Sequence, residues 1–133
     1  MRYYRLDWRE REALMEKLRD RVSADGGIVF AYVHGGFLRR EFFRDVDVAV
    51  WIRDEGEAFQ YAVDFSVRLE EELGLPVDVQ VLNEAPLPFK FHVFTGGRLI
   101  FSRDEELRLR ILEGAVKEYL DFKFLTSLIA RLA

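Results

Sequence analysis

Two aspartates placed two residues apart are the part of the sequence best suited to chemistry. Asp45 and Asp47 alternate with Val46 and Val48 in the stretch Asp45–Ile52, which is the period of a half-buried β-strand. Both carboxylates therefore project from one face of the strand, about 6.6 to 6.8 Å apart along it. An isolated Asp-x-Asp pair is most often a solvated strand face, so a function needs support from other residues.

Further residues supply that support. Asp78 lies on the polar face of another alternating stretch, Val77–Leu82, and eight residues separate Gly36 from Asp45. If the strands are neighbours, the three carboxylates converge, and Mg²⁺ prefers such oxygen ligands. Two such ions would stabilise the attacking and leaving oxygens of a phosphoryl transfer. Gly35-Gly36 ends the preceding apolar run, where glycines let backbone N–H groups approach a triphosphate.

The elements that must position these residues follow from hydrophobic periodicity and from the glycines and prolines between them. The expected helices are Leu6–Ala24, Phe37–Phe43 as a short connection, Glu57–Leu73, and a final helix from Asp104 to about Ala130. The expected strands are Ile28–Val33, Asp45–Ile52, Val77–Leu82 and Leu99–Phe101. The stretch Pro86–Phe94 suits either a strand or a helix. The order predicts an α/β (α+β) domain with a small mixed β-sheet and flanking helices.

Two details of this assignment can be checked against a structure. The helix Glu57–Leu73 is expected to bury an apolar face that comprises Phe59, Ala62, Val63, Val67 and Leu69. His34, at the end of a strand, is expected to be structural rather than catalytic.

Composition narrows the class of protein. A chain of 133 residues, half of them hydrophobic, is expected to form one domain over residues 1–133. The absence of cysteine and of a long apolar run predicts a cytoplasmic protein with no membrane contact. A net charge of −4 argues against direct binding of nucleic acid through a basic surface. Self-association into a homo-oligomer stays open.

The pattern Gly35-Gly36-x8-Asp45-Val46-Asp47-Val48, followed by Asp78, resembles the signature of the DNA polymerase β-type nucleotidyltransferase superfamily. In size the chain is similar to the minimal nucleotidyltransferases (MNT), in particular the MntA-type antitoxins that are encoded beside HEPN-domain toxins. Segments 77–86 and 118–122 also resemble these antitoxins, so the resemblance runs from about Ile28 to Phe122.

The resemblance implies a nucleotidyltransferase fold and a Mg²⁺-dependent protein adenylyltransferase. Such an enzyme would move AMP from ATP to a tyrosine of a partner HEPN ribonuclease toxin and thereby silence it. By the same resemblance, Asp45 and Asp47 would bind two Mg²⁺ ions, and Asp78 would bind the second ion and orient or deprotonate the incoming hydroxyl. Gly35 and Gly36 would hold the phosphates.

One departure, one arginine with two possible roles and two alternatives accompany this interpretation. Gly36 stands where many relatives have serine, so one phosphate contact is missing, and Arg39 is expected either to touch phosphate or to be a solvated helix residue. The first alternative is a small-molecule nucleotidyltransferase of the aminoglycoside-modifying kind, which would show an acidic cleft beyond the three aspartates. The second is a non-catalytic antitoxin that blocks its partner by binding. The nucleotide base, the acceptor and the number of AMP units stay open.

Overall fold

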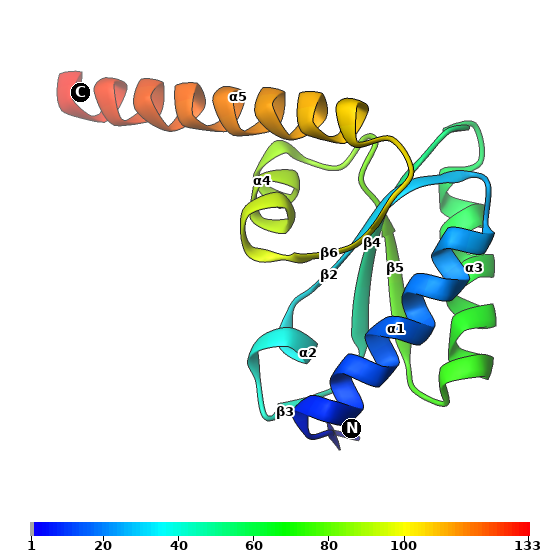
Figure 1. The fold of residues 1–133 in the computed structure, drawn as a ribbon. Helices are drawn as coiled ribbons and strands as arrows, with labels where there is room; N and C mark the ends of the chain where they lie inside the picture. The colour runs from blue at the N-terminus through cyan, green and yellow to red at the C-terminus, as the bar shows by residue number, and fades with distance from the viewer. Residues whose placement is uncertain (1) are drawn as a thin grey trace.

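The computed structural model, which describes residues 2–133, has helices packed on both faces of a small sheet (Figure 1). The elements in chain order are β1 (Tyr4–Arg5), α1 (Trp8–Ala24), β2 (Ile28–His34), α2 (Gly36–Arg39), β3 (Phe42–Phe43), β4 (Val46–Ile52), α3 (Ala58–Leu73), β5 (Val77–Val81), α4 (Leu87–Gly96), β6 (Arg98–Ser102) and α5 (Glu105–Leu132).

The main sheet has the strand order β5-β4-β2-β6 within the described residues. Strands β4 and β5 run parallel, whereas β2 is antiparallel to both of its neighbours. The predicted mixed α/β fold is therefore confirmed. The register places Asp47 opposite Asp78 on one side and opposite His34 on the other, which brings the polar ends of β2, β4 and β5 together.

Helices α1 and α3 cover one face of the sheet, and α4 and α5 cover the other. The alternation of β4 divides its side chains between the two cores: Val46, Val48 and Val50 pack with α1 and α3, whereas Ala49 belongs to the core beneath α4 and α5. Because Asp47 has the same parity as Ala49, it projects toward the face covered by α4 and α5. The predicted division of the strand into two faces is confirmed.

The connections differ from the prediction more than the long elements do. Helix α2 (Gly36–Arg39) covers only the start of the stretch Phe37–Phe43 that was predicted as a short helix, and Phe42–Phe43 instead forms β3, which pairs with β1. The ambiguous stretch after Pro86 is the helix α4, with prolines at its start, where a missing N–H costs no intrahelical hydrogen bond. Asp45 immediately precedes β4 rather than lying within it.

The expected apolar face of α3 is largely wrong. Phe65 and Leu69 are its buried residues, whereas Phe59, Val63 and Val67 are exposed. The helix packs on β5 and α1 through the side that carries Phe65. Phe59, Val63 and Val67 do not lie on that side, so their side chains stay in solvent.

The last helix, α5, extends well beyond the body of the protein (Figure 1). Asp104 caps its start by accepting a hydrogen bond from the backbone of Leu107 at 3.0 Å, as predicted. Its first half packs on α4, and Ala115 and Tyr119 are buried there. Beyond Tyr119 every side chain is exposed. No helix within residues 2–133 is both long and apolar enough to span a membrane.

A candidate metal and nucleotide site

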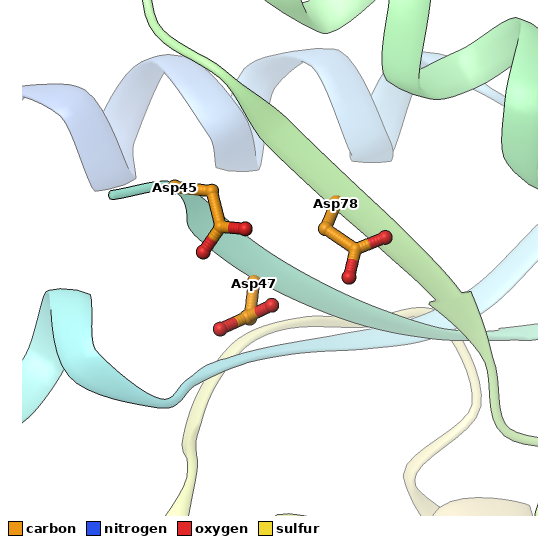
Figure 2. Close-up of side chains that lie close together, drawn as sticks. All are labelled: Asp45, Asp47 and Asp78. Atoms are coloured by element: carbon orange, nitrogen blue, oxygen red, sulfur yellow. The ribbon is translucent and has the colours of Figure 1, made fainter. Parts of the chain in front are cut away.

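Asp45, Asp47 and Asp78 form one cluster at the ends of β4 and β5 (Figure 2). Each offers a carboxylate oxygen, and these oxygens lie within 4.8 Å of one another. Oxygens bound to one Mg²⁺ lie at most about 4.2 Å apart, which is twice the Mg–O distance. The predicted convergence is confirmed, and the observed spacing is close to this limit.

The electrostatics of the cluster favour a cation. Burial raises the pKa of Asp47, and the negative charges of Asp45 and Asp78 raise it further; a hydrogen bond from Gln80 and the nearby His34 act in the opposite direction. Without a cation, the ionised form of Asp47 is therefore less favourable at this position than in water. A divalent ion bound by the three carboxylates would remove that repulsion, so the chemistry of the donor set fits Mg²⁺.

Gln80 is a polar residue of the cluster for which the sequence predicted no role. Its Nε2 donates to Asp47 Oδ1 at 3.0 Å and to Asp78 Oδ2 at 2.8 Å, and its Oε1 lies 2.8 Å from His34 Nε2. His34 therefore contacts the site through Gln80. The signal in the sequence was the position of Gln80, two residues after Asp78 on the same strand face.

The turn before α2 contains the position that requires glycine. Gly35 has φ +79° and ψ −156°, a region that is essentially restricted to glycine. A Cβ atom built on Gly35 would lie 2.4 Å from Asp47 Oδ2, whereas a Cβ on Gly36 would meet its nearest atoms at ordinary distances of 3.7 and 3.9 Å. The close approach of backbone and carboxylate thus depends on Gly35.

Two pockets flank this turn. The larger, of about 480 Å³, is bordered by Gly35 and Arg39 and by residues of α4, including Phe89 and His92. The smaller, of about 270 Å³, lies on the side of Gly36 and is lined by Asp45, Asp47, Arg40 and Arg44 among others.

The arginines of α2 and the segment after it give the site both signs of charge. Arg39 donates from Nη2 to the carbonyl oxygen of Gly96 at 2.8 Å, which fixes its guanidinium at the border of the larger pocket. Arg40 and Arg44 line the smaller pocket beside the aspartates, and neither was singled out in the sequence. Guanidinium groups beside carboxylates suit a ligand that carries both phosphate and a metal ion.

Comparison with known families agrees with this arrangement. The family "Polymerase beta, Nucleotidyltransferase" matches residues 16–106, a span that contains the glycine turn and all three aspartates. The chain belongs to this nucleotidyltransferase family. No curated protein matches it in sequence.

Solved structures show the same fold at low identity. One is a chain of the complex between tri-AMPylated Shewanella oneidensis HEPN toxin and MNT antitoxin, with TM-score 0.71 and 16% identity over 91% of this nucleotidyltransferase and 96% of that chain. A toxin–antitoxin structure with AMP-PNP has TM-score 0.68 and 19% identity, over 90% and 95% of the two chains. The MntA–HepT toxin–antitoxin structure has TM-score 0.65 and 17% identity, over 94% and 97%.

The raised pKa of Asp47 leads to a prediction about the stability of the fold. Because folding raises the pKa of Asp47, protonation favours the folded, metal-free nucleotidyltransferase. Asparagine resembles the protonated form, so Asp47→Asn should raise the melting temperature without metal. Mg²⁺ should stabilise the wild type, by about 2.7 kcal/mol at a hundredfold excess over its dissociation constant, and should stabilise the variant much less.

Thermal unfolding with and without Mg²⁺ measures both effects. Asp64→Asn, which removes an exposed carboxylate on α3, is the matched control and should keep the full response to Mg²⁺. An equal response in the Asp47→Asn variant would show that Asp47 is not a metal ligand.

Proposed function

We propose that this nucleotidyltransferase transfers AMP from ATP to a tyrosine hydroxyl of a partner HEPN-domain toxin and so acts as an antitoxin. The observation that carries the proposal is the convergence of Asp45, Asp47 and Asp78 beside the Gly35 turn. Similar folds occur in a complex of MNT antitoxin with tri-AMPylated HEPN toxin and in a toxin–antitoxin structure with AMP-PNP, which supports this choice of donor and acceptor.

The three aspartates divide into two roles in the proposal. Asp45 and Asp47, both half-buried, would hold two Mg²⁺ ions against the phosphates, and Asp78 would help to hold the second. Bound there, Mg²⁺ would supply Lewis-acid stabilisation of charge on the transferred phosphoryl group. Asp78 is the exposed member of the cluster, so it is the carboxylate that an incoming acceptor can reach.

The two pockets accommodate the parts of ATP. The phosphates lie along the turn, against Gly35 and Gly36, with Arg39, Arg40 and Arg44 to balance their charge. The pocket of about 480 Å³ beside Gly35 has the volume expected for a small-molecule site, and Phe89 and His92 offer aromatic surfaces for the base.

The reaction is a substitution at the α-phosphorus. The tyrosine oxygen forms a bond to the α-phosphorus while the bond from this phosphorus to the oxygen that bridges to the β-phosphate breaks. Pyrophosphate leaves with that electron pair, and the hydroxyl proton passes to Asp78 and then to solvent. Placement of the two oxygens in line and stabilisation of the charge between them supply the catalysis.

The lining of the pockets argues against an aminoglycoside-type acceptor. Among the described residues, Asp45 and Asp47 are the acidic side chains that line the two pockets, and arginines make up most of the other charged groups. A polycationic drug would need additional carboxylates in the acceptor region, whereas a protein partner brings its own hydroxyl and needs no such cleft.

Incubation of the purified protein with its partner toxin, ATP and Mg²⁺ tests the proposal. Intact-mass spectrometry should show one or more AMP additions on the toxin. If the toxin loses its ribonuclease activity without any gain in mass, the protein is an antitoxin that acts by binding alone.

The exposed half of α5 is the surface that the toxin contacts in this proposal. It carries a stripe of exposed apolar residues, of which those three or four apart lie on the same side of the helix: Phe124, Leu125, Leu128, Ile129 and Leu132. An exposed apolar stripe of this kind marks an interaction site. It belongs to the helix that covers the sheet face from which Asp47 and Asp78 project, so a toxin docked there lies on the side of the site.

We expect the double variant Phe124→Ser, Ile129→Ser to bind the toxin at least tenfold more weakly, which is about 1.4 kcal/mol. Both side chains are exposed, at 70% and 56%, so the fold should be unaffected. Phe59→Ser, at an 82% exposed phenylalanine on α3, is the control and should bind normally. The affinity is measured by calorimetric titration of the toxin into the wild type, the double variant and Phe59→Ser. Equal affinities for all three would place the interface elsewhere.

A further inference from the structure

Gln80 connects two of the three carboxylates through a single amide group. It lies on β5 two residues after Asp78 and opposite Ala49 of β4. Its Nε2 donates to Asp47 Oδ1 at 3.0 Å and to Asp78 Oδ2 at 2.8 Å. Because an amide nitrogen carries two hydrogens at a fixed angle, these two bonds together fix the distance between the two carboxylates.

His34 holds the oxygen end of that amide. Its Nε2 lies 2.8 Å from Gln80 Oε1, and an amide oxygen only accepts, so the imidazole is the donor. The reversed amide would direct its oxygen at two carboxylates and lose both of those hydrogen bonds, so the carboxylates set the direction of the amide and the donor form of the imidazole matches it. The ring itself is held edge-on against Phe89, with centroids 5.5 Å apart.

We propose that His34 and Gln80 act as a positioning pair, in which His34 anchors the Gln80 amide and the amide holds Asp47 and Asp78 ready for the metal. This inference rests on the proposed function, because it assigns the pair to the metal site.

The expected consequence is a loss of metal affinity rather than of fold. Groups that hydrogen-bond to metal ligands typically contribute about 10- to 100-fold to metal affinity. Without the amide, Asp47 and Asp78 are free to rotate apart under their mutual repulsion, and the binding of the metal must then also supply the free energy that brings them together.

The test uses Mn²⁺ as the probe, with its dissociation constant measured by electron paramagnetic resonance on the isolated chain. Gln80→Met keeps the length of the side chain and removes both donors, and it should weaken Mn²⁺ binding by about 10- to 100-fold. His34→Phe keeps a ring against Phe89 and removes only the donor to Gln80, and it should weaken binding by a smaller factor. Gln60→Met is the control, since Gln60 donates at 2.8 Å to Asp64 on the exposed side of α3.

The double variant His34→Phe, Gln80→Met identifies a positioning role specifically. If His34 acts only through Gln80, the double variant binds Mn²⁺ no more weakly than Gln80→Met alone. The Mg²⁺ concentration needed for half-maximal AMP transfer should rise by the same factor as the Mn²⁺ dissociation constant. Additive losses, or normal Mn²⁺ binding by Gln80→Met, would overturn the inference while the proposed function stands. If the wild-type chain itself does not bind Mn²⁺, the metal site and the proposed function fail together.

Discussion

The double variant Asp45→Asn, Asp47→Asn is expected to transfer no AMP to the toxin and to fold at least as stably as the wild type. The substitutions remove two negative charges from the proposed metal ligands, and asparagine is a poor substitute for a carboxylate on a hard cation. The fold should survive because the change relieves the repulsion and the burial of charge that raise the pKa of Asp47.

Intact mass of the toxin after incubation with ATP and Mg²⁺ measures the loss. The control is the double variant Asp20→Asn, Asp64→Asn, which makes the same change in net charge at exposed positions on α1 and α3 and should transfer AMP normally. If the variant lacking Asp45 and Asp47 carboxylates still adds AMP, catalysis does not depend on this cluster, and the proposed function is wrong.

The aspartate cluster was predictable because its members obey local rules. Alternation places Asp47 on the polar face of β4 and Asp78 on the polar face of β5, and a strand–helix–strand connection favours parallel neighbours. These two facts favour the convergence of the carboxylates, and the observed register, with Asp47 opposite Asp78, completes it. Most of the long helices and strands follow from the same periodicity.

The pair of His34 and Gln80 was not predictable from periodicity, because 46 residues separate the two side chains. Their contact depends on β2 lying beside β4 and on β4 lying beside β5, with Asp47 opposite both His34 and Asp78. Neither the strand order nor the register is encoded in a local pattern. The pairing of β1 with β3 was not predicted for a different reason: strands of two residues are too short to show alternation.

The error in α3 has a similar physical origin. Helix α3 carries apolar residues on more than one side. Phe59 and Phe65 each fit an apolar stripe with helical spacing. Packing against β5 and α1 selects the side with Phe65, and Phe59 is left exposed. Helical periodicity gives the spacing of a face, but tertiary contacts decide which face is buried.

Gly35→Ala is expected to abolish both metal binding and AMP transfer, whereas Gly36→Ala should leave the fold and metal binding intact. At Gly35 the backbone has φ +79° and ψ −156°, a conformation that costs a residue with a side chain about 1 to 3 kcal/mol. The new methyl group would also lie 2.4 Å from Asp47 Oδ2, so the carboxylate must move away from the cluster.

The neighbouring glycine makes this comparison decisive. A methyl group on Gly36 would meet only Arg40 Cδ at 3.7 Å and Phe43 Cβ at 3.9 Å, which are ordinary contacts. The Mn²⁺ dissociation constants and the melting temperatures of the two variants separate the causes. Gly35→Ala should lose stability and Mn²⁺ affinity together. The added Cβ atom both strains the backbone at this residue and displaces the Asp47 carboxylate. A Gly35→Ala variant that is destabilised but binds Mn²⁺ as tightly as the wild type would show that the turn supports the fold without holding Asp47 in the metal site.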